Sequence, residues 1–298
     1  MATVTTQNAA VANRTAIALA SGYETYNPIS PVVFKDVDPT RRDEIFSIHA
    51  HDGSFTEVGE AANFPSVDIL QVGSLTLTQR TFKKKLVVSK LMQRFDSENA
   101  IMEEAMMIGF DARVSADQLC ADVLNAGFTT ETTWDGNSLF NNSHVVGSLA
   151  VVNDNLNSGA LTDTSLNDGI VLMRDLVSHR GLAMPVLPRF LIVPTALEKK
   201  ARELLDSGLD PESANNSVNT HRSRGITVVV WELLTSTTAW FLAGDKMYHK
   251  LVKLVSIPFT VENRPGIYTE SGSAEVRVDY ALEAGAPDYL GVVGSLGT

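Results

Sequence analysis

His49 and His51 are the first residues in this sequence whose type and spacing could do chemistry. They stand in the stretch IFSIHAHDG at residues 45–53, where an apolar run ends in His-Ala-His. Side chains two residues apart on a strand share a face, so both imidazoles could reach one metal ion, as in some metal-dependent hydrolases.

Such a hydrolase also needs further histidine and acidic ligands at the ends of later strands. The remaining histidines do not follow apolar strands in this way: His144, His179, His221 and His249. We therefore expect two histidines on an ordinary surface strand and no catalytic, metal or cofactor site. A metal-dependent hydrolase using His49 and His51 stays as an alternative.

Other signatures of chemistry are missing from the sequence. Its single cysteine, Cys120, lies within a helical stretch, which indicates a buried helix residue rather than a nucleophile or a zinc ligand. The sequence contains no phosphate-binding glycine loop, no dinucleotide-binding fingerprint and no nucleophile elbow. We expect a protein that is not an enzyme.

The composition and net charge of the chain indicate which kinds of molecule it is expected to bind. The chain has 298 residues, 44% of them hydrophobic, and a net charge of -11. The apolar content supports a sizeable core, and the acidic balance disfavours a tight grip on nucleic-acid phosphates. No apolar run approaches the roughly 20 residues that span a bilayer, so we expect a soluble protein without a membrane partner.

Charge is distributed along the chain in blocks of one sign. Residues 43–73 carry six acids and no base, and residues 74–95 carry six bases and no acid. The bases are Arg80, Lys83, Lys84, Lys85, Lys90 and Arg94, and acids follow at positions that include Glu98, Glu103, Glu104 and Asp111. Adjacent blocks of opposite sign indicate complementary packing within the chain or between copies of it.

The elements that carry these charges predict an α+β fold, mostly antiparallel. Residues 43–73 and 74–95 read as strands of one long two-stranded excursion. Residues 97–126 have apolar side chains at three- and four-residue steps, which predicts one long helix. Further helices are expected at 163–180 and 195–208, a buried strand at 188–194, and a strand pair at 226–234 and 238–244. The first 28 residues read as an arm that needs a surface to lie against.

The order of these parts resembles the HK97-type major capsid proteins of tailed phages, and most of all the Mu-like major head subunit group. The segment TWDGNSLFNNSH at 133–144 is similar to that group's tryptophan, Asp-Gly, Leu-Phe, His segment. Residues 181–207 resemble its strand that ends at Val-Pro before a helix, and AWFLAGD at 239–245 resembles its late Trp-Phe strand. FTEVGEAANFP at 55–65 looks like the lead-in to an E-loop.

The resemblance implies the HK97-like capsid fold and a division of the chain into its parts. These would be an N-terminal arm (1–42), an E-loop (43–95), a P-domain with the spine helix (96–159), an A-domain (160–251) and return strands of the P-domain with the C-terminus (252–298). In the A-domain, a polar loop would face the capsomer axis and would present Asp210, Asn215, Asn216, His221, Arg222 and Arg224.

The resemblance also implies a function. The chain would be the major capsid protein of a tailed double-stranded DNA phage, forming pentamers and hexamers of an icosahedral shell in the virion, assembled in the host cytoplasm. Expected partners are other copies of the chain, portal and scaffold proteins, decoration or cement proteins, and packaged DNA by non-specific contact only. Because the sequence goes almost directly from Met1 to the arm, we expect a separate scaffold protein or none, and a non-covalent shell.

Capsomers of this family lay the E-loop over a neighbouring P-domain, which would bring the charge blocks of two copies together. We expect Arg80, Lys83, Lys84, Lys85 and Lys90 to lie against a neighbour's Glu98, Glu103, Glu104 and Asp111. The loop tip at Phe64 and Pro65 would rest on a partner. An encapsulin-type compartment shell is the alternative with the same fold.

Overall fold

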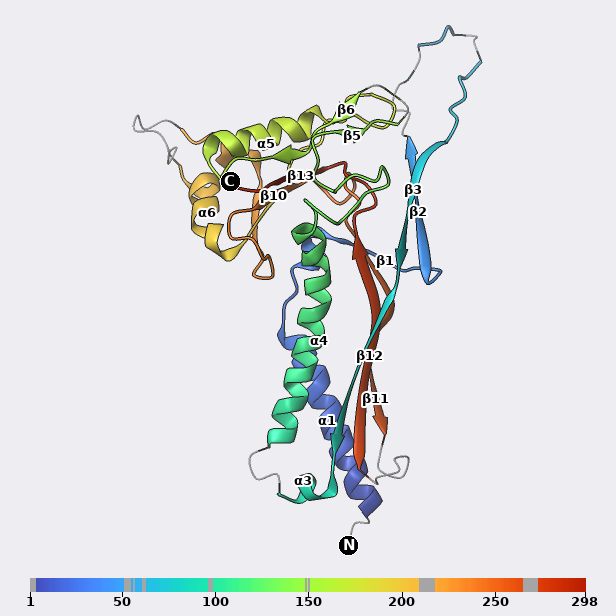
Figure 1. Cartoon of the computed structure of the whole chain (residues 1–298), viewed down its shortest axis with the longest axis vertical. Helices are drawn as coiled ribbons and strands as arrows, with labels where there is room; N and C mark the ends of the chain where they lie inside the picture. Colours follow the sequence, from blue (N-terminus) through green and yellow to red (C-terminus); the bar gives the residue numbers. More distant parts are fainter. Residues whose placement is uncertain are drawn as a thin grey trace.

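The computed structural model describes residues 4–50, 55, 57–60, 63–95, 99–147, 149, 151–208, 218–264 and 273–298. A tall column of helices and long strands carries a compact domain at one end, and a hairpin projects beside that domain (Figure 1). Among the described residues, no helix is both long and apolar enough to cross a membrane.

The column consists of two long helices on one face of a four-stranded sheet. Helix α4 (Ala100–Asn125) confirms the helix predicted at 97–126. The sheet has the order β1-β11-β12-β4. Its strands are β1 (Lys35–Val37), β11 (Val252–Arg264), β12 (Ala274–Gly285) and β4 (Arg80–Val88). In the first half of β12 the even-numbered residues, such as Val276 and Val278, are buried against the helices, while Glu275, Arg277 and Asp279 face outward and are partly exposed.

The N-terminal arm is a helix, α1 (Val4–Thr25), and the surface it lies against is α4 of the same chain. Its buried side chains are Ala12, Thr15 and Leu19, at 1%, 0% and 0% exposure, and two of these three are small. Glycines allow the two backbones to touch: a Cβ at Gly22 would lie 2.0 Å from the Met106 oxygen, and one at Gly109 would lie 2.0 Å from the Leu19 oxygen.

The two-stranded excursion predicted over 43–95 is wrong in its second half. Strand β2 (Asp43–Ala50) pairs with β3 (Leu70–Thr78), but the chain then changes partner at Gln79. Strand β4 pairs with β12 in the long sheet, and Lys90–Phe95 forms the short helix α3 instead of a strand. The strands predicted from apolar alternation are therefore present up to Val88. Which strand β4 pairs with is a tertiary contact, and the local sequence pattern does not specify it.

The compact domain is built on a five-stranded sheet with the order β7-β13-β10-β8-β9. Strand β8 confirms the predicted buried strand, but it lies between β9 and β10, so the predicted pairing of those two strands is wrong. The strands are β7 (Leu156–Asn157), β13 (Val292–Ser295), β10 (Trp240–Ala243), β8 (Phe190–Val193) and β9 (Thr227–Val230).

Two helices pack against this sheet, and several short elements lie between the longer ones along the chain. Helix α5 (Asp163–Asp175) begins at Thr162, whose side chain accepts from the Ser165 N–H, but it ends six residues before Gly181, where its end was predicted. Helix α6 (Glu198–Asp206) confirms the helix predicted at 195–208. The short elements are α2 (Ser30–Val33), β5 (His144–Val145), β6 (Val152–Asn153), η1 (Thr195–Leu197) and η2 (His221–Arg224).

Asp117, a buried carboxylate on α4, joins the column to the compact domain. It is 1% exposed. Its Oδ1 accepts from the Ser30 N–H at 2.7 Å, and its Oδ2 accepts from the Tyr26 hydroxyl and from Trp231 Nε1, both at 3.0 Å. The Ile29 N–H donates to Oδ2 at 3.3 Å. One side chain thus satisfies donors from the linker after α1 and from the segment after β9.

His249 is a buried histidine that the structure holds neutral. It is 2% exposed, and its Nδ1 accepts from the Leu251 N–H at 3.2 Å. Burial, together with the nearby Lys246, lowers the pKa of His249 from 6.5 to about 4, and Asp245 offsets this only in part.

We expect His249 to contribute acid sensitivity to folding. Below pH 6.5 the His249 side chain of the unfolded chain is protonated, whereas in the folded chain it becomes protonated only near pH 4. The stability is therefore fully present above pH 6.5 and is lost, by up to about 3 kcal/mol, as the pH falls to 4. Urea titrations of His249→Asn should show that the free energy of unfolding depends less steeply on pH between these values.

Candidate inter-subunit surfaces

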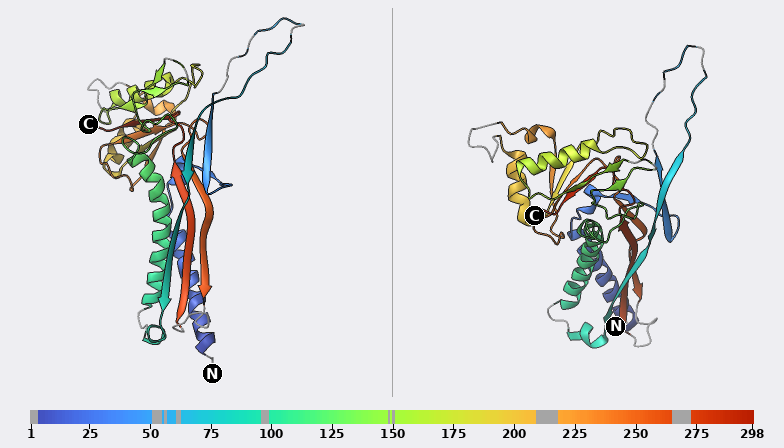
Figure 2. Two further views of the ribbon diagram at one scale, coloured as in Figure 1. Left: turned by 45° about the vertical axis from the view of Figure 1, so that its right-hand side comes forward. Right: turned by 45° about the horizontal axis from the view of Figure 1, so that its top comes forward.

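The hairpin of β2 and β3 projects from the body (Figure 2), and apolar side chains on it are exposed. Phe64 is 96% exposed and Ile69 is 84% exposed, and Pro65 is exposed beside them. Just before β3 begins, Arg180 Nη2 donates to the Asp68 carbonyl at 2.6 Å. An anchored strand pair whose outer apolar residues are exposed is typical of a surface that meets another molecule.

Two of the bases predicted to face a neighbour have partners in their own chain. Arg80 forms a bidentate pair with Glu283, at 2.6 and 2.7 Å, and this hydrogen bonding raises the pKa of Arg80. Lys84 points to the helix side of the sheet, where its Nζ lies 3.7 Å from Asp111 Oδ2. The charges of Arg80, Lys84 and Asp111 therefore also act within the subunit.

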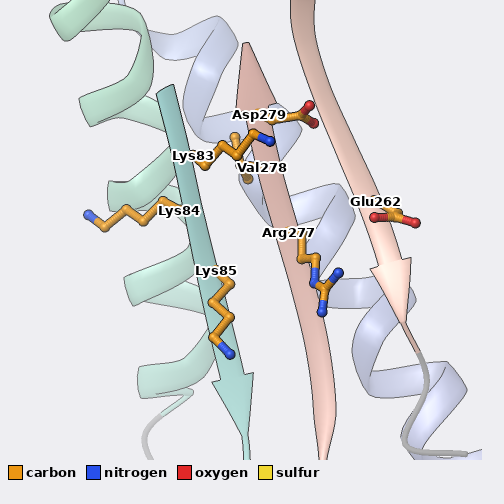
Figure 3. Close-up of a pocket in the computed structure, with 7 residues that line it drawn as sticks. All are labelled: Lys83, Lys84, Lys85, Glu262, Arg277, Val278 and Asp279. Carbon is orange, nitrogen blue, oxygen red and sulfur yellow. The ribbon is translucent and has the colours of Figure 1, made fainter. Parts of the chain in front are cut away.

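Lys83 and Lys85 lie on the outer face of the long sheet, away from the helices (Figure 3). Lys83 is opposite Asp279 and Lys85 is opposite Arg277 in the register of β4 and β12. Arg277 forms an ion pair with Glu275 at 3.2 Å. The residue opposite Lys85 is therefore a base whose charge is already paired. Neither Lys83 nor Lys85 forms an ion pair within the described residues, and both line a shallow cavity of about 360 Å³.

The far end of the column exposes a second group of apolar side chains. Leu91 and Phe95 on α3 are 70% and 72% exposed, and they line an open cavity beside Ile101. The bases and acids predicted for assembly surround it: Lys90, Glu103 and Glu104 are exposed there. Glu98 lies outside the described residues.

The loop expected to face the capsomer axis is described only in part. Asp210, Asn215 and Asn216 lie outside the described residues, while Arg222 and Arg224 are exposed. Arg224 Nη2 donates to Asn167 Oδ1 at 3.0 Å. The prediction for His221 is wrong: it is 2% exposed and its Nε2 lies 2.9 Å from Asp163 Oδ1, so it ties η2 to the start of α5.

Only one histidine of the pair at 49 and 51 lies among the described residues. His49 is exposed on β2, and His51 lies outside the described residues. Across the described ranges, no group of three His, Cys, Asp or Glu side chains could hold a metal ion.

Sequence reasoning missed two buried histidine–aspartate pairs beneath the hairpin. His144 Nδ1 lies 2.8 Å from Asp135 Oδ2, and His179 Nε2 lies 3.0 Å from Asp288 Oδ2. Tyr289 stacks on His144 with ring centroids 3.9 Å apart. Burial alone would raise the pKa of Asp135, but hydrogen bonds from His144 and Thr133 hold that pKa well below its usual range.

These pairs have a structural explanation. Asp135 accepts from the Thr133 hydroxyl at 2.6 Å and from the Asn137 N–H at 3.1 Å, so it shapes the turn in TWDGN while it orients His144. The Asp-Gly dipeptide was the available signal for the turn, but its histidine partner nine residues later was not readable from spacing.

The comparisons with known proteins identify the family. The sequence matches the family model described as phage capsid protein over residues 73–295, which is most of the chain. No curated protein is similar enough to the sequence to match.

Solved structures of low identity show the fold. The chain aligns with a virus-like particle protein from Pyrococcus furiosus at a TM-score of 0.56 and 12% identity, over 95% of this chain and 98% of that one. It aligns with the capsid of bacteriophage JBD30, decorated with minor capsid protein trimers, at 0.57 and 14%, over 70% and 91%. The SrpI encapsulin of Synechococcus elongatus PCC 7942 aligns at 0.51 and 11%, over 90% and 85%.

These matches confirm the predicted HK97-like capsid fold. The chain belongs to the phage capsid protein family, and it is a major capsid protein, a structural protein of the phage virion.

Proposed function

We propose that copies of this chain form the pentamers and hexamers of an icosahedral head that encloses the double-stranded DNA of a tailed phage. The projecting hairpin carries the proposal, because Phe64 and Ile69 on it are 96% and 84% exposed. Helix α3, which carries the exposed Leu91 and Phe95, lies at the opposite end of the molecule (Figure 1). Patches at opposite ends favour head-to-tail contacts, which close into rings.

The proposal extends to the subgroup of the family, the place of assembly and the partner proteins. The chain belongs to the Mu-like major head subunit group, is assembled in the host cytoplasm, and works with portal, scaffold and decoration or cement proteins. Packaged DNA is held by non-specific contact only, which suits a net charge of -11.

We divide the chain by function into the arm (1–42), the E-loop, the P-domain and the A-domain (160–251). The hairpin pairing of β2 and β3 supports an E-loop that ends near Thr78 rather than at residue 95. The pairing of β13 with β10 and β7 supports counting Val292–Ser295 with the A-domain sheet. The loop with Asp210, Asn215, Asn216, Arg222 and Arg224 would face the capsomer axis.

Negative-stain electron microscopy of the protein expressed alone, with light scattering on the same sample, tests this function. We expect rings or closed particles of regular size. A small species that persists at all concentrations, with or without a co-expressed scaffold, would contradict it.

An encapsulin-type compartment is the second candidate, because the SrpI encapsulin shares the fold. The contents of particles isolated from the native source distinguish the two. A phage head contains double-stranded DNA, and a compartment contains a protein cargo.

Charge reversal at the outer face of β4 should stop assembly. Lys83→Glu with Lys85→Glu removes two bases that have no ion pair among the described residues, and places acids where a neighbour's Glu103 and Glu104 are proposed to lie. Each exposed pair is worth only ~0.2–1 kcal/mol, but it recurs at every subunit. We expect at least a tenfold lower particle yield with an unchanged melting temperature.

A control pair with the same change in charge is Lys199→Glu with Lys200→Glu on α6, which should assemble normally. Normal shells from the β4 variant would show that Lys83 and Lys85 do not face an acidic surface.

A further inference from the structure

An open cavity lies at the foot of the hairpin, where β3 passes into β4. It measures about 850 Å³, and three arginines line it: Arg41, Arg42 and Arg80. The loop before β2 forms one wall, and the start of β4 with the middle of β11 forms the other. The cavity is separate from the Lys83 and Lys85 surface, which lines a different depression further along β4.

The acids beside this cavity are already engaged by other donors. Glu44 Oε2 accepts from the Thr40 and Arg41 backbone N–H groups at 3.0 and 3.1 Å. Asp43 Oδ1 accepts from the Thr78 hydroxyl at 2.7 Å. The guanidinium groups of Arg41 and Arg42 are exposed and have no carboxylate partner in the part of the chain that the structure describes.

Arg80 adds a fixed charge to the same wall. Its Nε and Nη2 are held by Glu283 at 2.6 and 2.7 Å, which leaves its remaining N–H groups for another acceptor. The carboxylate of Glu283 neutralises one of the three charges, so the lining keeps a positive excess from Arg41 and Arg42.

The floor of the cavity also offers an unused donor. Gln79 is 8% exposed, and its Oε1 accepts from the Ser256 hydroxyl at 2.7 Å. Its Nε2 is buried and has no hydrogen-bond partner among the described residues. A buried donor without a partner is unfavourable, and native structures normally supply an acceptor for it.

Arg41 and Arg42 thus bring to this cavity two guanidinium groups without a carboxylate partner among the described residues, and an oxyanion is the ligand that fits them. Two free guanidinium groups match the planar, two-oxygen geometry of a carboxylate. The chain has 35 acidic residues and 24 basic residues, so other copies of it supply exposed carboxylates in excess. The same acidic balance disfavours DNA phosphates as the occupant.

We propose that this cavity binds an exposed carboxylate of a second copy of the chain, and that the contact fixes the angle at which the hairpin leaves the long sheet. The inference rests on the proposed shell function. It adds a site for which neither the family match nor the fold assigns a ligand.

Zero-length cross-linking tests the contact directly. Arg41→Lys with Arg42→Lys keeps the charge and introduces amines that a carbodiimide joins only to carboxylates in contact. The variant is prepared in natural and isotope-labelled form, and the two are mixed before assembly. We expect mass spectrometry to find mixed-isotope peptides that join residue 41 or 42 to an acid of another copy.

Charge reversal supplies the second readout. Arg41→Glu with Arg42→Glu should lower the yield of closed particles at least tenfold while the melting temperature is unchanged, and Lys199→Glu with Lys200→Glu is the charge-matched control. If the reversed variant forms normal shells and residues 41 and 42 give only same-chain cross-links, the site is overturned while the shell function stands.

Two other outcomes also decide the matter. If the unaltered chain forms no particles and the Arg41→Lys, Arg42→Lys variant gives no mixed-isotope cross-links, both the shell and the site are overturned. If the reversed variant assembles normally but its particles lose packaged DNA, the occupant is a nucleic-acid phosphate, and the proposal of a second copy is wrong.

Discussion

Asp117→Ala should lower the free energy of unfolding by about 4 kcal/mol, because several buried donors lose their acceptor at once. The Tyr26 hydroxyl, the Ser30 N–H and Trp231 Nε1 all donate to this carboxylate. Water does not reach the site, since Asp117 and Trp231 are 1% and 0% exposed. Urea unfolding followed by tryptophan fluorescence measures the loss, and the emission should shift to the red if Trp231 becomes hydrated.

The matched control is Asp122→Ala, one and a half turns further along the same helix. Asp122 is exposed and accepts from Gln118 Nε2 at 2.7 Å, so its removal should change stability by less than about 0.5 kcal/mol. Equal effects of the two substitutions would mean that Asp117 does not hold the column and the compact domain together.

Gly109→Leu should separate α1 from α4 and destabilise the column by about 3 kcal/mol. A Cβ at this position would lie 2.0 Å from the backbone oxygen of Leu19, and a backbone atom cannot swing aside as a side chain can. The displaced helix would expose Ala12 and Leu19, which are buried in the native structure. Amide hydrogen exchange should therefore increase across Val4–Thr25 and much less in the compact domain.

Gly59→Leu provides the comparison, because a Cβ at Gly59 would meet no atom within 4 Å. It should leave both stability and exchange in α1 unchanged. Full protection of α1 in the Gly109 variant would show that the helices can pack without close backbone contact.

The elements that sequence reasoning predicted well are those whose pattern is local. Helix α4 was readable because its buried residues, such as Ala105, Ile108 and Ala112, recur at three- and four-residue steps. Strand β8 was readable because a short apolar run between prolines must be buried. In both cases one segment of sequence carries the whole signal.

The helical structure of the arm was not readable from the sequence, for a physical reason. The face of α1 that packs on α4 consists of small residues such as Ala12 and Thr15, so it shows little amphipathic contrast. Its stability comes from backbone proximity at Gly22, which is visible only when the partner helix is in place.

The sequence shows the blocks of charge on the proposed assembly surfaces, but it does not show which residue each charge contacts. Whether Lys84 faces Asp111 of its own chain or a neighbour depends on which side of β4 lies against the helices. That side is fixed by the pairing of β4 with β12, whose partners are almost two hundred residues apart in sequence. Asp117 could have been suspected, because it is a charged residue within the apolar stripe of a helix.

The change of partner at Gln79 has a mechanical consequence for a shell under internal pressure. Strand β3 ends at Thr78 and β4 begins at Arg80, and the chain runs straight from the hairpin into the column without a turn (Figure 1). A pull on the hairpin is therefore directed along β4, and it loads the ladder between β4 and β12 in shear. Under shear all the hydrogen bonds of the ladder resist together, whereas under peeling they would break one after another, so a pull on the hairpin is borne by the whole length of the β4–β12 ladder.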